Sequence, residues 1–311
     1  LGAGGGRRPV ARPETAVLVS DWATALAPHG LRPLHVVGQG MEGVVLRVEG
    51  DLVVKVWQHR TADELAALQA FYEAVSLPVR TTRLLDVVPV GERWASIEPH
   101  LAGKPMTADL RDGDVAAVAD VLDALAEAPA GPALTALPAL PGEPPLDVTT
   151  GFGPGLADLV ERRASPVLAR AVPDLADVVA AVTGRLRSMP AAAPGLVHGD
   201  LVAANLLVDD RRRPAAVLDF GFLTTVGDPA FDAAVTSSVF DMYGAGARRT
   251  EVLLEEAFAH RHGHDPARLA VYRAAYAVLT ATCFSASGSD GHFAWCVAML
   301  GRPDVRRGLA G

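Results

Sequence analysis

Residues capable of acid–base chemistry and of binding a hard cation recur at short intervals in the second half of the chain. His198, Asp200 and Asn205 follow the pattern H-x-D-x-x-x-x-N, and a D-F-G triplet begins 14 positions after Asn205, at Asp219. A carboxylate at Asp200 suits a group that orients a hydroxyl nucleophile and accepts its proton. Oxygen ligands at Asn205 and Asp219 suit Mg²⁺, which takes few protein ligands. His198 is expected to be structural and to fix the loop through hydrogen bonds. The set predicts phosphoryl transfer.

A glycine-rich segment near the start of the chain is the second candidate. Gly38, Gly40, Gly43 and Val45 match the pattern G-x-G-x-x-G-x-V. A dinucleotide-binding turn would open a helix after the glycines, but here strand-forming residues follow them. This favours a hairpin whose backbone can approach phosphates closely because it lacks Cβ atoms. An ordinary glycine-rich β-turn is the alternative.

Lys55 lies 12 positions after Gly43 and alternates with valines. In a strand this alternation turns the lysine away from its apolar neighbours, so it is either a solvated lysine or a point charge for phosphate oxygens. We expect a glutamate of the following helix to pair with it. Glu64 is preferred over Glu73, although a capping box that starts at Thr61 also accounts for Glu64.

Changes in hydrophobic period divide the chain into a β-rich part and a helical part. The first part predicts a short helix, three strands, a longer helix and two further strands, at residues 16–29, 34–57, 62–75, 83–90 and 93–98. The second predicts helices at residues 107–127, 154–164, 173–188 and from 229 onward, with a Pro- and Gly-rich connection at 128–146 and strands within 196–219. We therefore expect an α+β fold of two lobes, with a β-rich N-terminal lobe at residues 1–98, whose residues 1–15 form a flexible tail, and a mainly helical lobe at 99–311.

Composition narrows the classes of function. Lys plus Arg is 28 and Asp plus Glu is 36, which gives a net charge of −8. A nucleic-acid binder would show a basic patch or an alkaline pI, so we expect no nucleic-acid partner. The chain shows no apolar signal segment and no uninterrupted run of about 18 apolar residues, so we expect no membrane span and a cytoplasmic location. The two cysteines, Cys283 and Cys296, are expected to be buried thiols, with a single disulfide between them as the alternative.

On these residues the sequence resembles the aminoglycoside phosphotransferase family, which shares the protein-kinase-like fold. The resemblance extends from about residue 34 to about residue 300. Gly199 stands where protein kinases usually carry Arg, and Gly227 follows Gly221 by six positions, which leaves no room for a protein-kinase activation loop. The segment from Gly227 to Asp232 looks like the family's G-D-x-x-x-D signature. Asp228 is expected to cap the next helix, and Asp232 to be a buried acceptor.

The resemblance implies several further roles. The glycine turn and Lys55 would position ATP, and Glu98 to His100 would form the hinge whose backbone bonds adenine; GTP in place of ATP is not excluded. The loop departs from the family at Leu201 to Ala204, where many relatives have His-Pro-Gly before the Asn. The polar segment from Ser285 to His292 is expected either to line the acceptor pocket or to form a helix–helix turn.

The function expected is transfer of the ATP γ-phosphoryl group to a hydroxyl of a small molecule, with Mg²⁺ as cofactor. The acceptor class implied is an antibiotic, an aminoglycoside or a related natural product, which would confer resistance. A metabolic kinase for choline, homoserine or a sugar is the alternative in the same fold. A nucleotide-binding pseudoenzyme is a remote alternative, because Lys55, Asp200, Asn205 and Asp219 are all present. No obligatory protein partner is evident.

Overall fold

The computed structural model describes residues 19–40, 42–111 and 113–310 of the 311-residue chain, and the predicted tail at residues 1–15 lies outside them. Contacts divide the chain into two compact units. The first unit comprises Leu1–Arg60 and Leu85–His100, and the second comprises Thr61–Leu84 and Leu101–Gly311. The mixed α/β fold, β-rich at its start and helical towards its end, confirms the predicted class.

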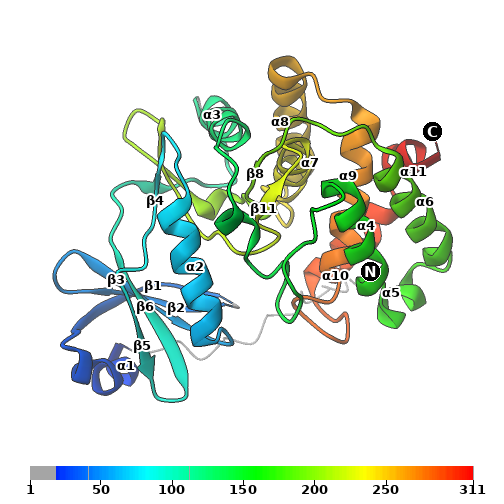
Figure 1. Ribbon diagram of the computed structural model, residues 1–311. Helices are drawn as coiled ribbons and strands as arrows, with labels where there is room; N and C mark the ends of the chain where they lie inside the picture. The colour runs from blue at the N-terminus through cyan, green and yellow to red at the C-terminus, as the bar shows by residue number, and fades with distance from the viewer. Residues whose placement is uncertain (1–18, 41, 112, 311) are drawn as a thin grey trace, which may run out of the picture. The chain divides into compact units, whose positions relative to one another are not determined.

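The first unit is built on one antiparallel sheet of five strands in the order β1-β2-β3-β6-β5. Its strands are β1 (Pro33–Gly40), β2 (Gly43–Val48), β3 (Leu52–Trp57), β5 (Asp86–Val90) and β6 (Arg93–Pro99), preceded by α1 (Val19–Leu26) and η1 (Ala27–His29). Valines at alternate positions bury one face of the sheet, where Val44, Leu46, Val54 and Val56 pack with Leu26 of α1. Figure 1 shows α1 beside this sheet. The three strands expected within residues 34–57 are therefore confirmed.

The second unit opens with α2 (Ala62–Ala74), which begins at the predicted capping box: Thr61 Oγ1 accepts from the Glu64 N–H, and the Glu64 carboxylate accepts from the Thr61 N–H. The α2 side chains Phe71 and Tyr72 pack on Phe220, with ring centroids 5.2 and 6.0 Å away. These contacts explain why α2 belongs to the unit that carries the D-F-G triplet. The lobe boundary at residue 98, with α2 in the first lobe, stays a prediction.

The rest of the second unit is helical, with two small sheets. Its strands are β4 (Arg80–Thr81), β7 (Lys104–Pro105), β8 (Gly195–Val197), β9 (Leu206–Val208), β10 (Pro214–Val217) and β11 (Thr225–Gly227). Its other helices are α3 (Asp114–Ala126), η2 (Pro132–Thr135), α4 (Phe152–Arg163), α5 (Pro166–Ala171), α6 (Leu175–Ser188), η3 (Ala203–Asn205), α7 (Ala230–Val239), α8 (Ala247–His262), α9 (Pro266–Thr280), α10 (Gly291–Gly301) and α11 (Pro303–Ala310). The strands form one sheet in the order β4-β10-β9-β7 and a separate pair, β11-β8.

Helix α9 is the centre of the second unit. Every residue from Leu269 to Thr280 is buried, as expected for a helix enclosed by others on all sides. It contacts α4, α7, α10 and α11, and Figure 1 shows these helices grouped around it. None of the helices in the described part of the chain has the length and apolar character that a membrane crossing requires.

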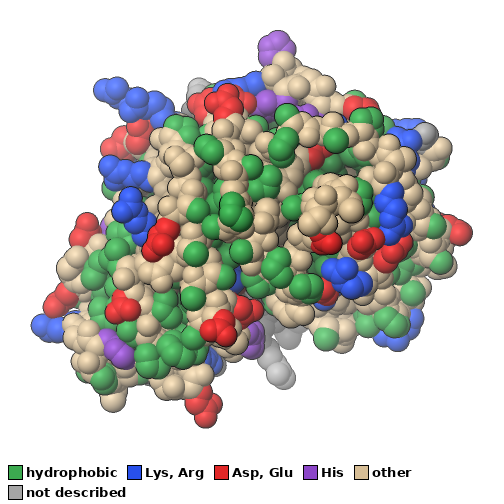
Figure 2. Space-filling model, viewed as in Figure 1, with side chains coloured by type: hydrophobic (Ala, Val, Ile, Leu, Met, Phe, Trp, Pro, Cys, Tyr) green, Lys and Arg blue, Asp and Glu red, His purple; other side chains and the backbone are tan. Residues whose placement is uncertain are grey.

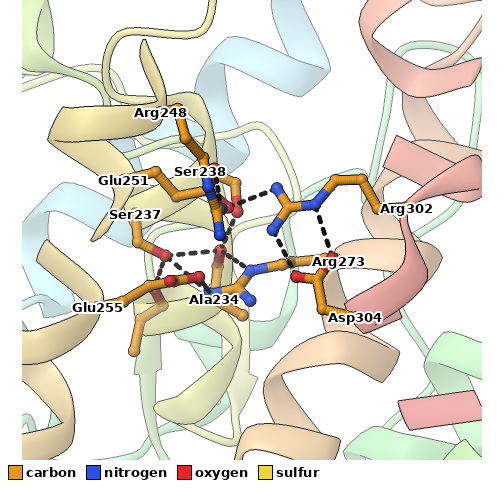
Figure 3. Close-up of polar contacts among 10 residues, drawn as sticks. Ala234, Ser237, Ser238, Arg248, Glu251, Glu255, Arg273, Arg302 and Asp304 are labelled. Carbon is orange, nitrogen blue, oxygen red and sulfur yellow. Dashed lines mark hydrogen bonds and ion pairs between the residues drawn. The ribbon is translucent and has the colours of Figure 1, made fainter. Parts of the chain in front are cut away.

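A buried polar network ties α9 to α7 and α8 (Figure 3). Arg273 of α9 is 5% exposed, and its guanidinium lies 2.6 Å from the Glu255 carboxylate and donates to the Ala234 carbonyl at 3.3 Å. Beside it, Arg302 pairs with Glu251 at 2.5 Å. Burial lowers the pKa of Arg273, while Glu255 opposes that shift. A buried charge without its partner is strongly unfavourable, so the network fixes the position of α9.

The outer surface carries charges of both signs. On the face shown in Figure 2, Asp and Glu side chains lie interspersed with Lys and Arg side chains and with apolar ones. Both cysteines are free thiols, and Cys296 is buried whereas Cys283 is partly exposed. The prediction that the two thiols are unpaired is therefore confirmed. The prediction that they are buried is confirmed for Cys296 and is wrong for Cys283.

Candidate active site

The loop that carries Asp200 leaves the end of β8 and is held by a carboxylate from α7. Asp232 accepts hydrogen bonds from the His198 N–H at 2.7 Å and from the Gly199 N–H at 2.8 Å. Burial raises the pKa of Asp232 to about 6, and the two N–H donors oppose that shift. Asp232 is thus the buried acceptor that the sequence predicts, and it fixes the two residues before Asp200.

His198 has a structural role, as predicted. Its Nε2 donates to the Leu218 carbonyl at 2.8 Å, and its Nδ1 accepts from the Asp200 N–H at 3.2 Å. Burial lowers the pKa of His198 to about 4, so the ring is neutral at pH 7 with its proton on Nε2. The ring also packs on Phe220 at a centroid distance of 4.5 Å. One imidazole therefore joins the loop that carries Asp200 to the D-F-G segment.

Backbone geometry in the loop explains why glycine stands at position 199. Gly199 has φ +88°, and a Cβ there would lie 2.2 Å from the Phe222 carbonyl oxygen. Any other residue would combine an unfavourable backbone conformation with a steric clash. Asp219 also has a positive φ, +58°, a conformation that costs free energy for a residue with a Cβ and that clusters at functional sites.

The chain brings the two predicted metal ligands together through a short hairpin. The Asn205 carbonyl accepts from the Leu218 N–H at 2.8 Å, next to Asp219, and β9 pairs with β10 between them. The Asn205 amide nitrogen donates to the Asp200 carbonyl at 2.9 Å. Because the amide nitrogen is used in that bond, the amide oxygen of Asn205 is the atom that can coordinate a cation. An amide oxygen and a carboxylate form a hard donor set, which fits Mg²⁺.

A threonine connects the D-F-G triplet to the loop that carries Asp200. The Gly221 N–H donates to Thr224 Oγ1 at 2.8 Å, and Thr224 Oγ1 donates to the His198 carbonyl at 2.6 Å. Farther along, Asp228 Oδ1 accepts from the Ala230 N–H at 3.0 Å. Asp228 thus bonds to the first N–H of α7, but the N-cap position is Pro229 and not Asp228, because the helix begins one position later than predicted.

The first unit holds the glycine turn and Lys55 in one hairpin system. Gly43 has φ +149°, and a Cβ on it would lie 1.9 Å from the Val56 carbonyl oxygen, whereas a Cβ on Gly38 or Gly40 would meet no described atom within 4 Å. Val45 of β2 is the cross-strand partner of Lys55 of β3. Gly43 is thus required by the sheet, while Gly38 and Gly40 leave space above the turn.

The Lys55 ammonium has a carboxylate partner that the sequence did not single out. Its Nζ lies 2.7 Å from Glu42 Oε2 and 3.9 Å from the centroid of the Trp57 ring. Glu42 also pairs with Arg60 at 2.9 Å. The sequence held one signal for this pairing. Glu42 lies within the glycine pattern, and a strand hairpin places Lys55 beside that turn. Pairing of Lys55 with Glu64, or with Glu73, stays a prediction.

Of the predicted hinge residues, Glu98 lies near the end of strand β6 and His100 directly follows that strand. Glu98 is buried, and its carboxylate accepts from Ser96 Oγ at 2.6 Å. The backbone N–H of His100 donates to the Asp51 carbonyl at 2.9 Å. An adenine contact through that N–H would require this bond to open, so the hinge role of Glu98 and His100 stays a prediction.

A cavity of about 410 Å³ in the second unit, here called the Asp200 cavity, borders the loop that carries Asp200. Sequence reasoning missed most of its wall, which is formed by Ala108, Asp200, Val202, Ala203, Ala204, Val239, Phe240, Asp241, Met242, Tyr243, Gly244, Tyr276, Phe284 and His292. Tyr276 of α9 places its hydroxyl 3.5 Å from Asp200 Oδ1. Of the segment from Ser285 to His292, His292 lines the cavity, whereas Ser285, Ser287 and Ser289 bond to one another. The segment thus connects α9 to α10, as one alternative predicted, and its role in an acceptor pocket stays a prediction.

Comparisons with known proteins agree with this geometry. The family model described as the phosphotransferase enzyme family matches residues 33–272. A thermostable mutant of aminoglycoside phosphotransferase APH(4)-Ia, in a ternary complex with ADP and hygromycin B, gives a TM-score of 0.70 at 19% identity, covering 93% of this chain and 98% of that chain.

A second solved structure, the GDP complex of an aminoglycoside 2'-phosphotransferase-IIIa mutant, gives a TM-score of 0.63 at 17% identity, covering 91% of this chain and 96% of that chain. No curated protein is detectably similar in sequence. At these identities the solved structures establish the fold. The resemblance inferred from the sequence is confirmed.

Proposed function

The chain belongs to the phosphotransferase enzyme family, and from that premise we propose that it transfers the γ-phosphoryl group of ATP to a hydroxyl of a natural-product antibiotic, an aminoglycoside or a related compound. The reaction would protect the host cell from that antibiotic. The use of ATP would place it in the cytoplasm. GTP is an alternative donor, since one solved relative of the same fold is a GDP complex and another holds ADP.

One observation carries the proposal: Asp200 lies in the wall of a 410 Å³ cavity, on a loop that also presents Asn205 and is hydrogen-bonded to the segment of Asp219. A base for a hydroxyl group must lie within hydrogen-bond reach of a bound acceptor. A cavity of a few hundred Å³ is the size of a small-molecule site. The arrangement therefore gives a small acceptor access to a carboxylate that can take its proton.

In the proposed reaction Asp200 orients the acceptor hydroxyl and takes its proton. The hydroxyl oxygen forms the new bond to the γ-phosphorus, and the bond from that phosphorus to the bridging oxygen of ADP breaks. Asn205 and Asp219 would hold Mg²⁺, which when bound offsets charge on the phosphate oxygens. Lys55 and the backbone at Gly38 and Gly40 would position the phosphates. Most of the rate enhancement then comes from positioning and electrostatics.

The base is tested by Asp200→Ala, assayed by ADP release with a panel of antibiotics and of primary metabolites such as choline, homoserine and sugars. We expect kcat to fall by about 10²–10⁴-fold, with nucleotide affinity nearly unchanged. Unchanged turnover would remove Asp200 from its role. Turnover of a primary metabolite with none of any antibiotic would replace the resistance function by a metabolic one, and no turnover with any acceptor would favour a pseudoenzyme.

The nucleotide site is tested by Gly40→Ala against the matched variant Gly131→Ala. A Cβ at either position meets no described atom within 4 Å, so neither change should alter folding through a clash. If phosphates pack on the turn, the Cβ at position 40 would enter their space, and the KM for ATP should rise about tenfold only in Gly40→Ala. Equal KM values in the two variants would contradict phosphate binding at the glycine turn.

A further inference from the structure

The wall of the Asp200 cavity is mainly apolar. Aliphatic and aromatic side chains supply most of it, among them Val202, Met242, Tyr243 and Phe284. Two of these are exposed although they are large: Tyr243 is 67% exposed and Phe284 is 45% exposed. Exposed apolar surface gathered at one site marks a binding surface. The wall is therefore suited to an apolar body.

Charge in the wall is confined to carboxylates. Asp200 and Asp241 line the cavity, and neither Lys nor Arg occurs among the described lining residues. His292 adds no positive charge at neutral pH, since burial lowers its pKa to about 4. Asp200 is assigned to the chemistry, which leaves Asp241 as the charged group that can pair with a cation of the acceptor.

The turn after α7 holds Asp241 and Tyr243 close together. The Asp241 carboxylate lies over Gly244, where a Cβ would lie 1.9 Å from Asp241 Oδ1. Within the described part of the chain the Asp241 carboxylate forms no hydrogen bond or ion pair. A single turn thus presents one carboxylate and one exposed aromatic ring to the same cavity.

We propose that the acceptor is amphipathic, with an apolar body packed against Tyr243 and Phe284, a hydroxyl directed at Asp200 and a single cationic group paired with Asp241. This rests on the proposed function and narrows it. A polycationic acceptor would bring several ammonium groups to a wall with one spare carboxylate. Each ammonium without a partner loses hydration without compensation, so such acceptors should bind weakly.

The first test compares acceptor classes by ADP release under one set of conditions. The panel pairs hydroxyl compounds that carry a large apolar ring system and one amine with polyamino sugars such as hygromycin B and streptomycin. We expect kcat/KM for the first class to exceed that for the second by about 100-fold or more. A preference for the polyamino sugars would overturn this inference and leave the proposed function intact. Absence of turnover with every hydroxyl compound would overturn the proposed function.

The second test removes the apolar surface. Tyr243→Ala and Phe284→Ala should each raise the KM for the amphipathic acceptor about tenfold, because each removes a large apolar contact, and should leave the KM for ATP unchanged. Leu253→Ala is the matched control: Leu253 is also exposed, at 42%, but lies on α8 outside the cavity wall. Equal KM values in the three variants would contradict the proposal.

The third test separates charge from shape. Asp241→Asn should raise the KM about tenfold for the amine-bearing acceptor, since it removes a charge-assisted contact. The same variant should leave the KM nearly unchanged for an otherwise matched neutral alcohol. If both acceptors are affected equally, Asp241 acts on the shape of the turn and the charge assignment is wrong.

Discussion

On one side of Asp200 the loop through His198 and Gly199 is fixed by buried hydrogen bonds to Asp232, Leu218 and Thr224. On the other side the cavity wall from Asp241 to Gly244 is partly or fully exposed, with Tyr243 67% exposed. The difference fits the roles proposed for the two regions, Asp200 as the base and the wall as the acceptor site. A base must be held to a fraction of an ångström, whereas a wall that accommodates an acceptor gains from surface that stays available until binding.

Among the changes that test this contrast, the largest effect is expected from Asp232→Ala, which removes the acceptor shared by two buried N–H groups. Leaving these donors without a charged partner should lower the free energy of unfolding by about 3 kcal/mol. The loop would also lose its fixed position, so kcat should fall about 100-fold. Denaturant unfolding and steady-state kinetics measure the two effects.

The comparison between the two regions gives the control for that variant. Asp241→Asn changes a partly exposed carboxylate in the cavity wall and should alter the free energy of unfolding by less than about 0.5 kcal/mol. If Asp232→Ala were as mild as Asp241→Asn, the contrast between a fixed loop and an adaptable wall would not hold.

The next effect concerns pH and the one buried histidine of the cavity wall. Because burial lowers the pKa of His292 from 6.5 to about 4, the unfolded chain binds a proton between these values that the folded chain does not. The contribution of His292 to the free energy of unfolding is therefore fully retained above pH 6.5, and it decreases as the pH falls from 6.5 towards 4. Between pH 7 and pH 5 the free energy of unfolding should fall by about 2 kcal/mol more in the wild type than in His292→Gln.

The difference between the two proteins is the quantity to measure, by urea unfolding at each pH. Other groups then cancel, including His198, whose lowered pKa acts in the same direction, and Asp232, whose raised pKa acts in the opposite one. Parallel pH dependences for wild type and His292→Gln would show that His292 is not held in its neutral form.

The smallest effect is expected where the two regions meet. Tyr276→Phe removes the hydroxyl 3.5 Å from Asp200 Oδ1 and keeps the ring in place. Losing this donor to the carboxylate should lower kcat about tenfold and move the acidic limb of the kcat/KM profile to higher pH. A purely structural tyrosine would leave that limb where it is, so the pH profile distinguishes the two roles.

Features set by neighbouring residues could be predicted from the sequence. The Val–Gly pattern indicated β1 to β3, and the capping box at Thr61 and Glu64 indicated the start of α2. The helix Pro166–Ala171 was missed, because six residues are too few for a periodic pattern to identify. Glu42 was missed as a partner of Lys55, since only the cross-strand geometry of a hairpin brings a turn residue to a strand lysine.

The sequence by itself determined the loop from His198 to Asn205, the hairpin that joins Asn205 to Asp219 and the glycine turn, because their parts are close in sequence and local chain geometry relates them. Only the tertiary structure decided that Tyr276, 76 residues after Asp200, reaches its carboxylate, and that Asp241, Tyr243 and Phe284 line one cavity. Packing of α9 among the other helices sets those positions. That packing depends on buried contacts between distant segments, which a single sequence does not encode as a local pattern.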